Sequence, residues 1–148
     1  MALRGAGALG APSLVSGAMS HHRDPVTAPG APDAVGPYSH AVRSGGLLFC
    51  SGQTPLDPAT GKLVEGSIGD QTRRCLENLQ LVCAAAGAEL SDAVRMGIYV
   101  IDMGSFAEVN EAYATFFAEG PPARSTIGVA ALPLGAGVEI DAIVTLPT

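Results

Sequence analysis

Two residues near the C-terminal end of the chain, Arg124 and Glu139, have side chains that could act together on a small acid. A guanidinium binds a carboxylate through two parallel hydrogen bonds, which the ammonium group of lysine cannot reproduce. A carboxylate can orient a water molecule and take up its proton. An ordinary salt bridge between neighbouring strands explains the same two residues, and for the pair alone it is the favoured interpretation.

The segments around these two residues predict strands that would position them. The two prolines before Ala123 remove backbone donors, so the chain should arrive extended at Arg124, at a corner leading into a strand over residues 126–131. Residues 137–146 alternate between apolar and polar side chains. Glu139 is therefore expected on the opposite face of its strand from Val138, Ile140, Ala142 and Val144.

Three more strands are predicted earlier in the chain. Residues 38–43 and 47–53 are expected to form a hairpin, because Ser-Gly-Gly between them is typical of a turn. In the second of these strands Ser51 should lie on the opposite face from Cys50. Residues 94–101 predict a further strand.

Two amphipathic helices separate the strands. Residues 68–86 place apolar side chains at helical spacing behind a capping box that begins at Ser67. A second capping box begins at Ser105, and its helix should extend to Gly120. The order ββαβαββ predicts a two-layer α+β domain, in which a mixed sheet has both helices on one face. The other sheet face should meet solvent or another subunit.

Composition limits the class of protein. A chain of 148 residues with 47% hydrophobic residues suits one domain with one core. The net charge of −6, with one lysine among eight basic residues, argues against binding to a nucleic-acid backbone. No apolar run is long enough to cross a membrane. Residues 1–31 have no periodicity and predict a disordered extension, which leaves residues 32–148 as the domain.

The cysteines and histidines do not have the spacing of metal ligands, so no metal is assigned. These residues are Cys50, Cys75, Cys83, His21, His22 and His40. Buried, reduced thiols are expected, together with a reducing, cytoplasmic compartment.

Five motifs in register give the chain a resemblance to a known family. The motifs are Gly-Pro-Tyr-Ser at 36–39, Ser-Gly-Gln at 51–53, the aromatic helix pattern of 106–117, Pro-Ala-Arg-Ser at 122–125 and Val-Glu-Ile at 138–140. In these the chain resembles the RidA/YjgF family of reactive-intermediate deaminases, from about residue 35 to 144. The resemblance implies a chorismate-mutase-like fold and a homotrimer with ligand clefts between its subunits. It also implies cofactor-free hydrolysis of enamines and imines, such as 2-aminoacrylate, to 2-oxo acids and ammonia.

The same resemblance implies roles for individual residues. Arg124 would bind the substrate carboxylate and Glu139 would position the attacking water. Tyr38 and Ser51 would line the cleft. The substrate-binding set would also include Asn110 and Thr126. Thr126 departs from the pattern, because many members have Cys at this position, which puts a role for a thiol in doubt.

Two alternatives to an enzyme of the 2-iminobutanoate/2-iminopropanoate deaminase type stay open. A non-catalytic trimer of the same fold could bind carboxylates or other proteins, since folds do not determine function. The presence of both Arg124 and Glu139 favours the enzyme, because anion binding requires only the arginine. RNA cleavage fits poorly with the acidic net charge.

Overall fold

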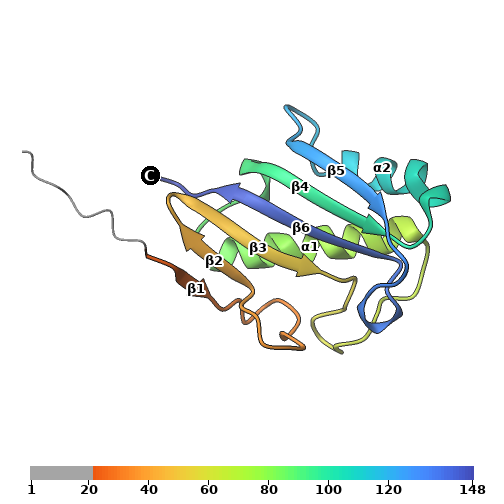
Figure 1. Cartoon of the computed structure of the whole chain (residues 1–148), viewed down its shortest axis with the longest axis horizontal. Helices are drawn as coiled ribbons and strands as arrows, with labels where there is room; N and C mark the ends of the chain where they lie inside the picture. Colours follow the sequence, from red (N-terminus) through yellow and green to blue (C-terminus); the bar gives the residue numbers. More distant parts are fainter. Residues whose placement is uncertain (1–21) are drawn as a thin grey trace, which may run out of the picture.

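A mixed β-sheet forms one layer of the structure, a computed structural model that describes residues 22–148 (Figure 1). Within that range the sheet has six strands in the order β1-β2-β3-β6-β4-β5. The strands are β1 Asp24–Val26, β2 Ala41–Ser44, β3 Leu47–Gln53, β4 Ala93–Val100, β5 Ala123–Gly128 and β6 Val138–Thr145. Neighbouring strands are antiparallel except β4 and β5, which are parallel.

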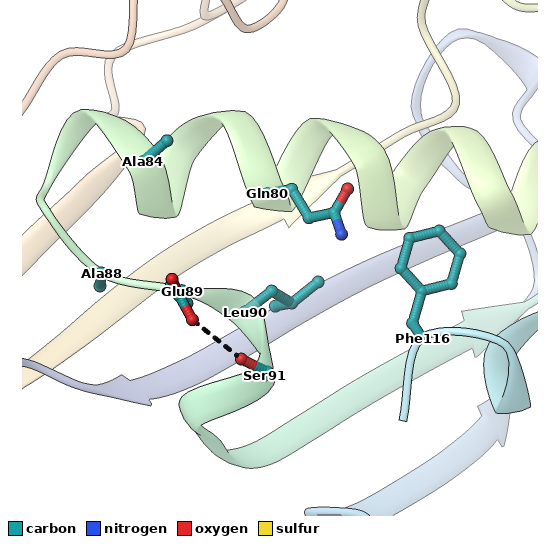
Figure 2. Close-up of a pocket in the computed structure, with 7 residues that line it drawn as sticks. All are labelled: Gln80, Ala84, Ala88, Glu89, Leu90, Ser91 and Phe116. Atoms are coloured by element: carbon teal, nitrogen blue, oxygen red, sulfur yellow. Dashed lines mark hydrogen bonds between the residues drawn. The ribbon is translucent and has the colours of Figure 1, made fainter. Parts of the chain in front are cut away.

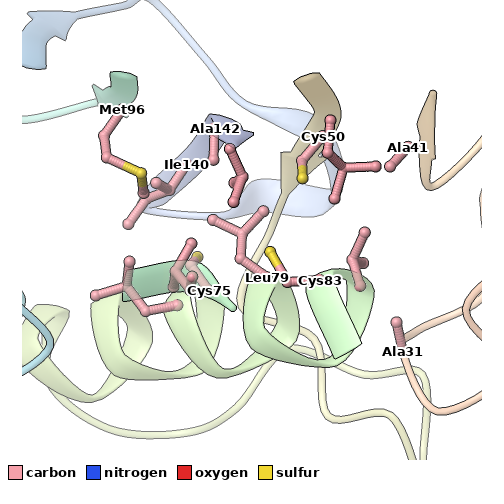
Figure 3. Close-up of a cluster of buried hydrophobic side chains, with 14 of the residues drawn as sticks. Ala31, Ala41, Cys50, Cys75, Leu79, Cys83, Met96, Ile140 and Ala142 are labelled. Carbon is pink, nitrogen blue, oxygen red and sulfur yellow. The ribbon is translucent and has the colours of Figure 1, made fainter. Parts of the chain in front are cut away.

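Helices α1 (Ile68–Ala85) and α2 (Phe106–Ala114) form the second layer, on one face of the sheet (Figure 1). The core lies between the layers, where side chains of α1 meet those of β3, β4 and β6 (Figure 3). Leu79 on α1 and Met96 and Ile140 on the sheet are fully buried. The predicted two-layer α+β fold is confirmed. Short 3₁₀ turns at Leu90–Asp92, Met103–Ser105 and Pro133–Gly135 complete the elements.

The capping box predicted at the start of α1 is present, and the one predicted at the start of α2 is not. The Ser67 hydroxyl accepts a hydrogen bond from the Asp70 amide, and the Asp70 carboxylate accepts one from the Ser67 amide, both at 3.1 Å. Ser105, by contrast, makes no side-chain cap. Glu108, its expected partner, accepts a hydrogen bond from the Gly69 amide at 3.1 Å, so it joins α2 to the first turn of α1.

Two boundaries that affect the site differ from the prediction. Helix α2 ends at Ala114 rather than Gly120, and Phe117 beyond its end still packs against Tyr113, with their ring centroids 4.8 Å apart. Strand β5 begins at Ala123 and ends at Gly128. Arg124 is therefore held inside a strand rather than at the corner before it.

The predicted boundary of the domain at residue 31 is too late. Asp24–Val26 forms strand β1, whose Val26 pairs with Ala41 of β2. Three residues that include a proline give too short a pattern for a strand to be predicted from sequence. Residues 1–21 of the predicted extension lie outside the described residues.

The second face of the sheet has no helix over it among residues 22–148 (Figure 1). Phe49 on β3 and Ile127 on β5 are 42% and 49% exposed. We call this surface the open face. None of the helices in the described part of the chain is long and apolar enough to span a bilayer.

Candidate functional site

The end of β3 is irregular where it carries the Ser-Gly motif. Cys50 pairs with Ala142 and Gln53 with Ile140, so three residues along β3 correspond to two along β6. The extra residue on one strand is characteristic of a β-bulge, which locally interrupts the hydrogen-bond ladder and redirects side chains. Ser51 and Gly52 occupy the bulge. The Ser51 hydroxyl donates a hydrogen bond of 2.7 Å to the Ser39 carbonyl, which fixes its direction.

The Glu139 carboxylate lies against Gly52. A Cβ atom at position 52 would be 2.8 Å from Glu139 Oε1, so the carboxylate can occupy this position only because residue 52 is glycine. Val138 and Ile140 are fully buried on the helix side, and the half-buried Glu139 therefore points to the open face, as predicted. Burial raises the pKa of the Glu139 carboxyl group, and the negative charge of Asp141 raises it further.

Tyr38, Ser51 and Glu139, three of the predicted site residues, line one cavity of about 270 Å³, which we call the Glu139 cavity. Val35, Gly52, Thr54 and Pro133 complete its lining. Tyr38 lies in the loop before β2 rather than in the predicted strand. Its hydroxyl accepts a hydrogen bond of 3.2 Å from the Val35 amide. The lining thus combines one carboxylate with three hydroxyl-bearing residues, Tyr38, Ser51 and Thr54.

Arg124 and Asn110 line a different cavity of about 400 Å³, which we call the Arg124 cavity. Its other lining residues are Tyr113, Ala114, Phe117, Pro121 and Pro122. Arg124 Nη2 donates to Asn110 Oδ1 at 2.7 Å, and the guanidinium carbon lies 4.8 Å from the centroid of the Tyr113 ring. Within residues 22–148 this guanidinium pairs with no carboxylate. It is a half-buried cation, held in place and available to an anion.

Two buried hydroxyl groups near this guanidinium have no hydrogen-bond partner among the described residues. They belong to Thr126, two residues after Arg124 on the same face of β5, and to Tyr113 of α2. Buried polar atoms are normally satisfied by protein or water. The surroundings of Arg124 can therefore accept further polar contacts.

The two charged site residues do not meet within one chain. Strand β4 lies between β5 and β6, so the salt bridge between neighbouring strands, considered from the sequence, is wrong. The residues also point to opposite faces. Arg124 pairs with the buried Met96 and contacts α2, whereas Glu139 pairs with Tyr99 on the open face.

Sequence reasoning missed the role of Gly52 and the presence of Asp141 beside Glu139. Asp141 accepts a hydrogen bond of 2.9 Å from the Tyr99 hydroxyl on the open face. The alternation of residues 138–144 places Glu139 and Asp141 on one face, and that signal was available in the sequence. The contact of Gly52 with Glu139 depends on the bulge, which no local pattern predicts.

A third cavity, of about 290 Å³, contains none of the predicted site residues (Figure 2). It lies between α1, residues 88–91 of the segment that follows α1, and Phe116. The described residues contain no cluster of three or more histidine, cysteine or acidic side chains able to hold a metal ion. Cys50, Cys75 and Cys83 are free and buried, as expected.

The fold and the two cavities define the class of protein: a two-layer α+β domain that presents a carboxylate in one small cavity and a free guanidinium in another. A family model described as Endoribonuclease L-PSP matches residues 28–146. The chain belongs to this family, the RidA/YjgF family that its motifs resemble.

Three relatives illustrate the similarity. The chain is 45% identical over 134 residues to Reactive Intermediate Deaminase A, chloroplastic, of Arabidopsis thaliana, covering 90% of this chain and 72% of that one. The crystal structure of the yeast protein YEO7 has a TM-score of 0.82 and 41% identity, covering 85% of this chain and 100% of that one. The structure of E. coli TdcF with bound serine has a TM-score of 0.79 and 35% identity, covering 84% and 99%.

Proposed function

We propose that this protein hydrolyses reactive enamines and imines, such as 2-aminoacrylate, to 2-oxo acids and ammonia. The observation that carries the proposal is the Glu139 carboxylate, whose pKa is raised, in one cavity with Tyr38 and Ser51. Similarity to a Reactive Intermediate Deaminase supports a deaminase in general. TdcF binds serine, a small amino acid, which supports a ligand of similar size that carries a carboxylate.

The reaction needs one water molecule and several proton transfers. The enamine accepts a proton at its terminal carbon and becomes the 2-imino acid, whose C2 is open to attack by water. Glu139, as a carboxylate, orients that water and takes its proton as the C–O bond forms. Glu139 then returns the proton to the nitrogen. As the C–N bond breaks, the new hydroxyl group gives up its proton to solvent, which balances the proton that solvent first supplied to the enamine carbon, and ammonia and the 2-oxo acid are released. A raised pKa suits this cycle, because the group must both accept and donate a proton near neutral pH.

Arg124 binds the substrate carboxylate in this scheme. Its bond to Asn110 and its contact with the Tyr113 ring leave the remaining guanidinium donors for a bidentate pair. Thr126 lies two residues further along the same face of β5, but its hydroxyl is buried and does not line the Arg124 cavity. The substrate requires no cofactor, since the imine carbon is already electrophilic.

A homotrimer completes the site in this proposal. Because Arg124 and Glu139 point to opposite faces of one sheet, a complete site needs the Arg124 cavity of one subunit beside the Glu139 cavity of the next. The apolar side chains on the open face, including Phe49 and Ile127, supply surface for such an assembly. Light scattering at micromolar concentration should give the mass of three chains. A monomer mass would refute the shared site.

A coupled assay tests the activity. A dehydratase generates 2-aminoacrylate from serine, and release of the 2-oxo acid is followed with and without this protein. We expect acceleration by the wild-type protein and a large loss of turnover in Glu139→Gln with ligand binding nearly unchanged. No acceleration with several imino acids would favour the non-catalytic carboxylate-binding trimer instead.

A further inference from the structure

The loop between β1 and β2 forms one wall of the Glu139 cavity and has little regular structure of its own. It contributes Val35 and Tyr38, which are 63% and 43% exposed. Its internal backbone hydrogen bonds include only short-range ones, from Ala31 to the carbonyl of Ala28 and from Tyr38 to that of Gly36. Such a segment needs an outside contact to keep one conformation.

The ring of His40 supplies such a contact, beside the packing of Ala28 and Ala31 in the core. The imidazole is only 5% exposed. Its Nδ1 accepts a hydrogen bond of 3.0 Å from the Ala28 amide, and its Nε2 lies 2.8 Å from the Pro32 carbonyl. An amide can only donate and a carbonyl can only accept, so these partners require a neutral ring with its proton on Nε2. One side chain thus holds the loop at two points, four residues apart.

His40 also connects this loop to the bulge at the opposite side of the cavity. Its backbone carbonyl accepts a hydrogen bond of 3.0 Å from the Ser51 amide. The carbonyl of the preceding residue, Ser39, accepts the hydrogen bond from the Ser51 hydroxyl. Residues 39 and 40 therefore fix Ser51 through their backbone, while the His40 ring fixes the loop that carries Tyr38.

We propose that His40 is a positioning residue of the candidate site, and that its neutral ring holds the loop wall of the Glu139 cavity at a set distance from Ser51. The inference rests on the proposed function, since the cavity is the one assigned to the imine. His40 touches neither the substrate nor the reacting atoms. It acts through Ala28 and Pro32, which belong to the same loop as the cavity-lining Val35 and Tyr38.

Two variants and one control test this role in the full chain. His40→Leu removes both ring hydrogen bonds and keeps an apolar side chain in the buried site. His40→Gln restores one acceptor and one donor on a carboxamide, in an arrangement similar to the two ring nitrogens. His22→Leu changes a histidine on the exposed surface and serves as the matched control.

Two readouts separate the role of His40 from the activity itself. In His40→Leu, exchange of the Ala28 amide hydrogen should become about tenfold faster or more while the α1 amides stay protected. The KM for the imine should rise about tenfold, with kcat changed much less, because the cavity wall rather than Glu139 is disturbed. His40→Gln should restore both values, and His22→Leu should alter neither.

Each result has a definite meaning. Unchanged exchange at Ala28 in folded His40→Leu would overturn the proposal, and so would faster exchange with an unchanged KM. If His40→Leu does not fold, nitrogen NMR of the wild-type ring decides, since a proton on Nδ1 at neutral pH contradicts the arrangement. If the wild-type protein turns over no imine, the proposed function fails, and the exchange data alone decide whether His40 holds this wall.

Discussion

Substitution of Gly52 by alanine is the sharpest test of how Glu139 is placed. The new Cβ would lie 2.8 Å from Glu139 Oε1, 2.9 Å from its Cδ and 3.1 Å from its Cγ. Ordinary contacts begin near 3.4 Å, so the carboxylate oxygen must move by about 0.6 Å. The side chain is flexible, and the backbone of Gly52 is not in the left-handed region, so the fold itself should tolerate alanine.

The expected cost falls on catalysis. A misplacement of about 1 Å at a reacting group can reduce the rate about a hundredfold. For the smaller shift at Glu139 we expect kcat to fall about ten- to a hundredfold, which corresponds to about 1.4 to 2.7 kcal/mol. The Tm should stay within about 2 °C of the wild-type value. The assay is steady-state release of the 2-oxo acid from 2-aminoacrylate, with the Tm measured on the same samples.

A control and a double variant make the test specific. Gly30→Ala adds the same methyl group where the nearest atom, on Leu81, is 3.7 Å away, and it should leave kcat unchanged. In a Glu139→Ala background, Gly52→Ala should have no further effect, because the group it displaces is gone. A folded Gly52→Ala protein with wild-type kcat would refute the argument that this glycine places the carboxylate.

Three other substitutions give distinct outcomes. Arg124→Lys should lower activity at least tenfold in a folded protein, because lysine lacks the planar, forked guanidinium group. If Arg124 formed only a solvated salt bridge, worth about 0–1 kcal/mol, the substitution would leave activity nearly unchanged. Asp141→Asn should shift the acidic side of the plot of kcat against pH to lower pH. Activity rises with pH as Glu139 ionises, and removal of the neighbouring negative charge lowers the pKa that burial and Asp141 together raise. The new amide oxygen can still accept the Tyr99 hydrogen bond, so an unshifted plot would show that Asp141 does not tune Glu139. Cys50→Ala should keep most activity, since this thiol is buried on the opposite side of β3 from Ser51, and a folded but inactive variant would contradict a mechanism without a thiol.

Most of the fold could be predicted from the periodic spacing of apolar residues along the sequence. The apolar spacing of residues 68–86 and the alternation of residues 138–144 give α1 and β6 nearly to the residue, because each pattern reflects one buried face. Strand β1 was missed because three residues show no period. The cap at Ser105 was wrong because Glu108 finds a tertiary partner in the Gly69 amide, which sequence spacing cannot reveal.

The sequence names the residues of the candidate site, whose roles stay predictions, but it does not give their arrangement. Tyr38, Ser51 and Glu139 do share a cavity, and Asn110 and Arg124 share another. The separation of the two groups follows from strand order, since β4 enters the sheet between β5 and β6. Pairings between strands far apart in the chain are set by the whole fold, so the sequence around Arg124 and Glu139 could not decide whether the two residues meet.

The placement of Arg124 and Glu139 on opposite faces has a consequence for mixed assemblies. If each site joins two neighbouring subunits, a chain that lacks Arg124 still offers an intact Glu139 half, and the reverse holds for a chain that lacks Glu139. Complementation between two individually inactive variants then becomes possible. When Arg124→Ala and Glu139→Ala chains are unfolded together and reassembled in equal amounts, about one interface in four should pair two intact halves. Activity should return to about that fraction of the wild-type value, whereas a site contained in one chain would recover none.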